Sequence, residues 1–319
     1  MYNRTNSVSI IHRAGILLLL MLLSVMHNSA SAAEQSVAVI YQEDKSFSVS
    51  IARELAKRLR ADQQRIELIP YKTLDPVRLG SIKPETLIVT LGSETTHGLF
   101  QHSFRNPVFS LLVSKQSYKT LLDEKPAGVS WSALYIDQPL NRQLSLIRHL
   151  LGDDQSIGVL LGPYSRTEHK ALQSIARRNR QSIRIEEITD EEQLIPSLKS
   201  LTDHSSVLLA IPDPMVFNKT TIRGILLLSY RENIPMIGFS RAYVKAGAIA
   251  AIYTRLEQIS EQAYQLIRQH GERNGLPRST YYPDDFSVAV NRKVARTLEI
   301  SVDSEDELIR KIKADEARR

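Results

Sequence analysis

The chain has 319 residues, a formal net charge of +6 and no cysteine. This length is enough for one large core or two cores of ordinary size, and the missing cysteines exclude disulfides, thiolate metal sites, thiol catalysis and a lipid anchor on cysteine. The charge is mild and its basic clusters are explained by salt-bridged helical faces, so nucleic-acid binding is not expected.

The first segment, residues 1–32, has the features of a secretory signal peptide. Arg4 and Arg13 form a basic region, residues 14–25 form a short apolar core, and the small residues 30–32 precede a cleavage site. The apolar run is shorter than the roughly 20 residues needed to cross a bilayer, and no later segment approaches that length. We therefore expect cleavage after Ala32 and a periplasmic protein with no membrane span; a retained N-terminal anchor is the alternative.

After this leader, short apolar runs alternate with longer amphipathic stretches, which is typical of parallel strands separated by crossover helices. The expected strands are residues 36–41, 65–70, 86–92, 107–114, 156–162, 206–212, 234–240 and 247–253. The expected helices include residues 47–60, 139–151, 166–178, 220–232 and 256–268. The predicted fold class is therefore α/β.

The alternation of strands and helices begins afresh after residues 128–139, which predicts two doubly wound, Rossmann-like lobes. We place the first hinge at residues 135–137. Two such lobes would direct the carboxyl ends of both sheets toward one cleft, where open α/β sheets bind their ligands. Functional residues are therefore expected in the loops that follow strands.

Four segments together resemble the periplasmic substrate-binding proteins of ABC importers, in particular the branch with tryptophan- and tyrosine-binding members. These segments are residues 89–100, 133–163, 234–253 and 284–302. Each is weakly specific alone, but the four occur in the family's order. The chain departs from the family pattern at residues 111–130 and 210–220 and in the segment that begins at Gly238. The resemblance therefore implies the fold more firmly than the identity of a ligand.

The resemblance also implies a discontinuous division of the chain. One lobe would contain residues 33–135 and 254–278, and the other would contain residues 136–253 and 279–319, joined by a three-segment hinge. The expected partners are a small-molecule ligand, such as an amino acid or aromatic carboxylate, and an ABC permease in the inner membrane. The alternative is a ligand-sensing or interaction protein on the same scaffold, serving a membrane sensor or an outer-membrane uptake system.

In the first lobe, the best candidate for a ligand-binding loop is Ser93-Glu94-Thr95. It follows a strand and Gly92, which permits a tight turn, and its hydroxyl groups can cap a helix whose free N–H groups attract a carboxylate. Glu94 could instead receive an ammonium group. A plain helix cap is the structural alternative. Tyr41, at the end of the first strand, is a candidate for stacking against a flat ligand.

In the second lobe, four candidates follow strands. Asp213 lies between two prolines and could bind an ammonium group, although an Asx turn would explain it equally well. Tyr164 could stack against the ligand, and Ser240 and Arg241 could bind a carboxylate. Arg241 could equally pair with a surface acid.

Catalysis, metal binding and cofactor binding are not expected. Residues 238–242 loosely resemble a nucleophile elbow, but only His270 follows Ser240 and no aspartate lies between them. His97 and His102 are five residues apart rather than three or four, and the other histidines are scattered, so no metal motif is present. The chain also lacks a Walker loop and a dinucleotide glycine pattern, which argues against a nucleotide cofactor.

Overall fold

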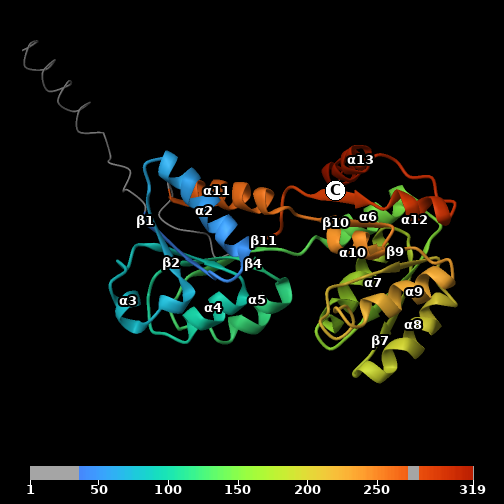
Figure 1. Ribbon diagram of the computed structural model, residues 1–319, viewed down its shortest axis with the longest axis horizontal. Helices are drawn as coiled ribbons and strands as arrows, with labels where there is room; N and C mark the ends of the chain where they lie inside the picture. Colours follow the sequence, from blue (N-terminus) through green and yellow to red (C-terminus); the bar gives the residue numbers. More distant parts are fainter. Residues whose placement is uncertain (1–35, 272–279, 319) are drawn as a thin grey trace, which may run out of the picture.

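The computed structural model describes residues 36–271 and 280–318. The predicted signal peptide, residues 1–32, lies outside the described residues. The described chain forms two lobes side by side, each built on a six-stranded sheet with helices on both faces (Figure 1). The α/β class and the two-lobed arrangement predicted from the sequence are thus confirmed.

The sheet of the first lobe is parallel throughout, in the order β11-β5-β4-β3-β1-β2. Its strands are β1 (Ser36–Tyr41), β2 (Arg65–Pro70), β3 (Leu87–Leu91), β4 (Val108–Val113), β5 (Trp131–Tyr135) and β11 (Thr280–Tyr281). The central strands are almost wholly buried and rich in Val, Ile and Leu, as helices on both faces require. Their carboxyl ends share one edge of the sheet.

Helices cover the two faces of this sheet as separate groups (Figure 1). One face carries α2 (Ser46–Ala61) and α11 (Leu256–Gly271), and the other carries α3 (Pro76–Gly80), α4 (Ser93–Phe100) and α5 (Lys115–Leu122). A short 3-10 turn, η1 (Tyr71–Thr73), precedes α3. The first core therefore includes α11, which follows the whole second sheet except β12 in the sequence.

The second sheet has the order β12-β10-β9-β8-β6-β7, in which only the edge strand β12 pairs antiparallel among the described strands. The strands are β6 (Ser156–Leu161), β7 (Ser182–Glu187), β8 (Val207–Leu209), β9 (Met236–Gly238), β10 (Ala250–Tyr253) and β12 (Ser287–Val290). The order of β6 to β10 repeats that of β1 to β5. Both lobes therefore direct equivalent loops from their carboxyl edges.

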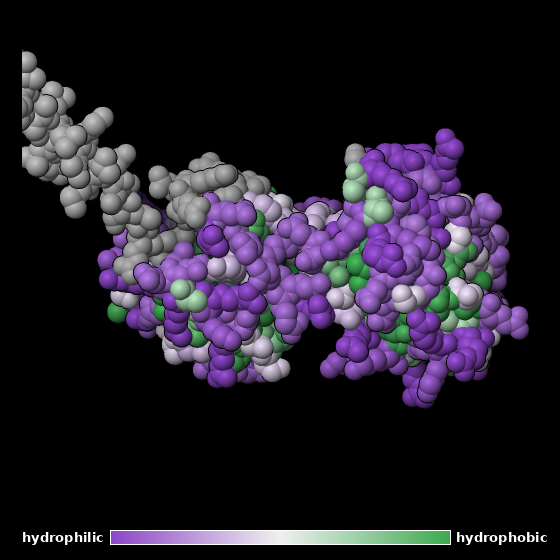
Figure 2. Space-filling model, turned by 90° about the horizontal axis from the view of Figure 1, so that it is seen from above, coloured by the Kyte–Doolittle hydropathy of each residue, from purple (hydrophilic) through white to green (hydrophobic). Residues whose placement is uncertain are grey.

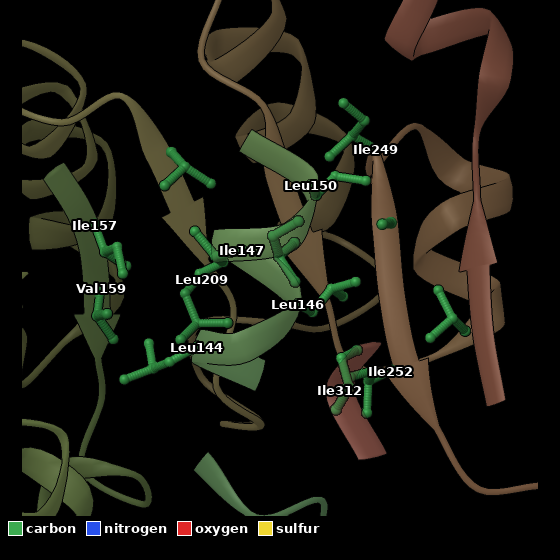
Figure 3. Packing of buried hydrophobic residues seen from close by; sticks show 14 of the residues in the cluster. Leu144, Leu146, Ile147, Leu150, Ile157, Val159, Leu209, Ile249, Ile252 and Ile312 are labelled. Atoms are coloured by element: carbon green, nitrogen blue, oxygen red, sulfur yellow. The ribbon is translucent and has the colours of Figure 1, made fainter. Parts of the chain in front are cut away.

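Helices also cover both faces of the second sheet. One face carries α6 (Leu140–Leu151), α7 (His169–Arg178), α12 (Arg292–Thr297) and α13 (Glu305–Ala317), and the other carries α8 (Leu194–Thr202), α9 (Ile222–Arg231) and α10 (Arg241–Ala246). Two 3-10 turns, η2 (Arg166–Glu168) and η3 (Glu191–Gln193), precede α7 and α8. Figure 3 shows Leu144 of α6 directed toward Val159 of β6 and Leu150 beside Ile249, with Ile312 of α13 in the same cluster.

The chain crosses between the lobes three times, at residues 136–139, 254–255 and 282–286. The first crossing begins where the sequence placed the first hinge. The sequence-based division assigned residues 279–319 to the second lobe, but β11 pairs with β5 of the first sheet, so the third crossing follows Tyr281. Two paired residues are too few to give a recognisable strand pattern in the sequence.

Arg142 ties the crossings together from the first turns of α6. Its guanidinium group donates hydrogen bonds to Gln138 of the first crossing at 2.8 Å and to the carbonyl of Pro283 in the third at 3.0 Å. Gln138 in turn donates to Thr254 of the second crossing. Arg142 also pairs with Glu316 of α13 and lies over the ring of Phe286. One buried cation therefore links all three hinge segments.

The surface shows two rounded bodies joined by a narrower waist (Figure 2). Hydrophilic residues dominate this view, and apolar residues form small separate patches. No helix among the described residues is long and apolar enough to cross a membrane.

Candidate functional site

A cavity of about 310 Å³ lies between the lobes, beside the hinge. Its walls come from loops at the carboxyl ends of β4 and β5 in the first sheet and of β6, β8 and β9 in the second. This is the position where open α/β sheets bind ligands, and the volume lies at the small end of the usual range for ligand pockets. The two lobes therefore build one site together.

The first-lobe wall begins at a bulge in β4. Leu112 has a φ of 60°, and the pairing of β4 with β5 shifts between Leu111 and Val113. Such a bulge redirects the strand end, here just before Ser114 and Lys115, which both line the cavity. The hydroxyl of Ser114 caps α5 by accepting a hydrogen bond from the Ser117 N–H at 3.0 Å.

Asp137 lies in the first crossing and lines the same cavity. One of its oxygens accepts a hydrogen bond from the backbone N–H of Lys115 at 2.6 Å. Burial raises the pKa of the Asp137 carboxyl above its ordinary value, because the backbone donors only partly offset the loss of water. The cavity therefore contains a carboxyl group whose negative charge is incompletely compensated.

The second-lobe wall depends on Asp213, which is 3% exposed. One carboxylate oxygen accepts from the backbone N–H groups of Tyr164 and Ser165, at 3.0 and 2.8 Å, and from the Ser165 hydroxyl. The other accepts from the N–H groups of Met215 and Val216. Asp213 thus fixes the loop after β6 against the loop after β8, rather than offering its carboxylate to a ligand.

Polar side chains bridge the cleft between α5 of the first lobe and residues 164–168 of the second. Lys115 Nζ lies 2.9 Å from a carboxylate oxygen of Glu168, and Lys119 Nζ lies 3.8 Å from the other. The Tyr164 hydroxyl is 2.8 Å from the hydroxyls of both Ser114 and Ser117. These contacts hold the lobes together over the cavity, and we call them the interlobe bridge.

Lys115 keeps its positive charge within this bridge. Burial alone would lower its pKa, but the hydrogen bond with Glu168 and the neighbouring Tyr282 and Glu168 outweigh burial, so the pKa of Lys115 is raised. The positive charge of Lys115 is thus neutralised by Glu168 from the opposite lobe rather than by solvent.

An aromatic row runs from the first core to the cavity. Trp131 stacks on Tyr118 with ring centroids 4.1 Å apart, Tyr118 meets Tyr135 edge to face at 5.7 Å, and Tyr135 meets Tyr282 at 5.3 Å. Tyr282 lines the cavity, as does Phe239 from the opposite lobe. Burial raises the pKa of Tyr282, so its hydroxyl stays neutral and can donate a hydrogen bond.

Of the eight residues predicted from the sequence as ligand-binding, the structure places two in the cavity wall. These are Tyr164 and Ser240, which follow β6 and β9. Arg241 begins α10 beside Ser240 and is exposed outside the lining of the cavity. Asp213 acts behind the wall, as described above.

The remaining four predicted residues lie on the same edge of the first sheet but farther from the hinge. Tyr41 ends β1 and packs against the first core. Ser93, Glu94 and Thr95 form the first turn of α4, after Gly92, whose φ is 99°. Thr95 donates its hydroxyl to the carbonyl of Leu91. This loop is therefore held by its own turn and does not line the cavity.

Glu94 is exposed and engaged by a neighbouring loop. Its carboxylate lies 2.8 Å from Lys45 Nζ, and the hydrogen bond with Lys45 lowers the pKa of Glu94. The Glu94 carboxylate is therefore already paired with Lys45, whereas the sequence interpretation offered it as a partner for a ligand ammonium group.

Sequence reasoning missed several residues of the cavity wall, among them Lys115, Asp137, Gln143, Glu168 and Tyr282. Lys115 carried a usable signal, because it directly follows the predicted strand 107–114, whereas Asp137 follows β5, a strand that the sequence did not predict. Gln143 and Glu168 lie within or just before helices, where polar residues are usually solvent-facing. Only their three-dimensional surroundings identify them.

No group of three or more metal-ligating side chains occurs in residues 36–271 and 280–318 as described. The polar groups of the cavity are hydroxyls, amides and oppositely charged side chains from two lobes. This cavity between two α/β lobes defines the class as a two-lobed ligand-binding protein.

Comparison of the sequence with family models makes the assignment specific. The model described as ABC transporter substrate binding protein matches residues 79–312, more than half of the chain. The chain therefore belongs to the family of ABC transporter substrate-binding proteins, as the sequence resemblance implied. A comparison with curated proteins gave no match.

Solved structures show the same fold at low sequence identity. A domain from Streptococcus pneumonia in complex with L-Trp is 15% identical, with a TM-score of 0.56, covering 85% of this chain and 97% of that one. The ligand-free, open structure of a substrate-binding protein with adhesive properties from Clostridium difficile is 16% identical, with a TM-score of 0.65 and coverage of 85% and 97%. A periplasmic ribose ABC transporter protein from Conexibacter woesei is 12% identical, with a TM-score of 0.51 and coverage of 87% and 98%.

Proposed function

We propose that this protein captures a small molecule in the interlobe cavity, in the periplasm, and delivers it to an ABC permease in the inner membrane. The observation that carries the proposal is the cavity of about 310 Å³ whose walls come from the carboxyl edges of both sheets. Family membership supports the transport role. Binding and release require no covalent step.

The chemistry of the cavity supports a small amino acid or aromatic carboxylate as the ligand. Tyr282 and Phe239 offer ring faces, while Ile136 and Ile211 add aliphatic surface. Lys115 and Glu168 meet from opposite lobes and bring one charge of each sign to the cavity lining, which suits a zwitterion.

Closure of the lobes is the proposed binding movement. Residues 136–139, 254–255 and 282–286 connect two lobes with separate cores, so rotation at these segments changes the cleft without repacking either core. A ligand that contacts both walls gains its full set of contacts only when the lobes are closed, and it therefore shifts the population toward that state.

The direct test is thermal unfolding of ligand-stripped protein with amino acids, small carboxylates, nucleobases and sugars. At a thousandfold excess over the dissociation constant, linkage stabilises the folded state by about 4 kcal/mol, which raises Tm by roughly 8 to 16 °C. One responding class would support solute capture. No response from any compound would contradict the proposal and favour a sensing or interaction role on the same scaffold.

The importer partner needs its own test. Tagged protein carrying its ligand should recover a permease from detergent-solubilised inner membranes, and ligand-free protein should recover less of it. Recovery of a sensor kinase or an outer-membrane receptor in place of a permease would overturn the transport part of the proposal while leaving ligand binding intact.

A further inference from the structure

Gln143 holds a buried polar atom with no hydrogen-bond partner. The side chain lies in the first turns of α6, is 5% exposed and lines the interlobe cavity. Its Oε1 is one of three buried side-chain oxygen atoms without a partner among the described residues. The other two, on Gln64 and Ser205, do not line this cavity.

An unpaired buried acceptor is costly, because the oxygen has lost its water and gained nothing in exchange. Most such atoms in folded proteins are paired, so each exception requires a reason. A position in the wall of a ligand cavity supplies one, since a hydrogen-bond donor on a bound molecule would satisfy the oxygen.

The neighbouring polar groups specify what that donor is. Lys115 is paired with Glu168, and Gln138 uses both ends of its amide on Arg142 and Thr254. Asp137, in contrast, is a second acceptor, held on one oxygen by a backbone N–H. Gln143 Oε1 and the Asp137 carboxyl therefore both stand in the cavity lining as acceptors, and one of them can carry negative charge.

We propose that Gln143 and Asp137 form an acceptor pair that recognises the amino group of the ligand. The inference rests on the proposed function and makes it narrower: the ligand is an amine-bearing molecule of amino-acid size, and a carboxylate without an amino group is rejected. An ammonium group supplies several donors and a positive charge, which match a neutral amide oxygen and a carboxylate in the lining of one cavity. Burial raises the pKa of Asp137, and a cation placed beside its carboxyl would lower that pKa again.

The experiment compares matched ligands by isothermal titration calorimetry. The twenty common L-amino acids are titrated first, followed by the deaminated counterpart of the strongest binder, which for L-tryptophan is indole-3-propionate. Loss of hydrogen bonds to a charged group should weaken binding on the order of 10- to 100-fold. Equal affinity for the two members of the pair would overturn the inference.

Gln143→Met then tests the residue itself. The substitution keeps the length and volume of the side chain, and it should weaken the amino acid by a similar factor while leaving the deaminated counterpart unchanged. The ligand-free variant should retain or increase its Tm, because an unsatisfied polar atom has been removed. A lower Tm together with equal losses for both ligands would indicate a structural role and contradict the proposal.

Gln64→Met is the matched control, since it removes the same kind of unpartnered oxygen from the first lobe, outside the cavity. It should leave both affinities unchanged. If a sugar or simple carboxylate binds and no amino acid does, the inference fails and solute capture stands. If no compound of any class binds, the proposed function fails and this inference fails with it.

Discussion

Glu168 forms ion pairs with two lysines across the cleft, so its substitution tests whether the interlobe bridge stabilises the closed state. Glu168→Gln keeps the shape of the side chain but removes its charge. The pairs with Lys115 and Lys119 are partly exposed, so we expect the loss to be about 1 kcal/mol or less of closed-state stability. Ligand affinity in calorimetry should fall by roughly fivefold at low salt and by less at high salt.

Glu187→Gln is the control for that charge change, because Glu187 pairs with His169 in the same lobe and does not line the cavity. Its affinity should match the unsubstituted protein at all salt concentrations. An unchanged affinity in Glu168→Gln would show that the interlobe bridge does not contribute to closure.

Asp137→Asn should change how stability depends on pH. The folded pKa of this carboxyl is raised by burial, so the folded state holds its proton more tightly than the unfolded chain does. Stability from this group is greatest below the unfolded pKa and falls as pH rises through the window up to the folded pKa. Asparagine does not ionise, yet it can still accept the hydrogen bond from Lys115.

The variant should therefore gain stability over the unsubstituted protein as pH rises through that window, and the difference should vanish in acid. Chemical denaturation at a series of pH values measures this difference. A constant difference at every pH would mean that Asp137 titrates alike in both states. The same substitution should weaken an amine-bearing ligand, which separates the stability effect from recognition.

Single residues of the site were predictable where the residue directly follows a buried strand and faces outward. Tyr164 and Ser240 meet that condition. Asp213 also follows a buried strand, but its carboxylate accepts hydrogen bonds from five nearby donors. A sequence cannot show which donors a turn will bring together. Gln143 is identified only by burial without a partner.

Among the helices and strands, α6 is the one whose first turns hold the hinge segments together, because they contain Arg142. The residue is 5% exposed and links Gln138, Pro283 and Glu316. Arg142→Met would leave the buried acceptors unpaired, and we expect a loss of about 2 to 4 kcal/mol in unfolding free energy. Urea denaturation measures it. Arg178→Met, at an exposed position of α7, should stay within about 0.5 kcal/mol.

Element prediction succeeded for the strands with continuous apolar runs. Each of the eight predicted strands contains an observed one, and β1 and β2 agree at both ends. The strand β5 was missed because Trp131 to Tyr135 alternates small, polar and aromatic residues and reads as a linker. The edge strand β7 was missed because its sequence SIRIEE is half charged, which suits an edge that faces water.

At the scale of the whole molecule, the first lobe depends on α11, a helix that follows five of the six strands of the second sheet in sequence. Ile259 of α11 is fully buried in the first core. Ile259→Ala should cost about 2 to 5 kcal/mol, and hydrogen exchange should accelerate mainly in β1 and β3. Equal acceleration in β6 and β8 would show that the lobes unfold as one unit.

The matched substitution in the other lobe is Ile157→Ala in β6, which belongs to the second core. It should accelerate exchange in the second sheet and spare the first. The pair of variants therefore measures how independently the two cores unfold. Because only three short segments connect the lobes, we expect this independence to be substantial.

The late position of α11 also affects how the newly made chain behaves. Any process that delivers the polypeptide from its amino end presents β1 to β5 long before α11 arrives to complete the cover of one face of their sheet. Until then the half-covered sheet exposes apolar surface and offers binding sites to chaperones. The first lobe can therefore complete its core only after β6 to β10 have also been delivered.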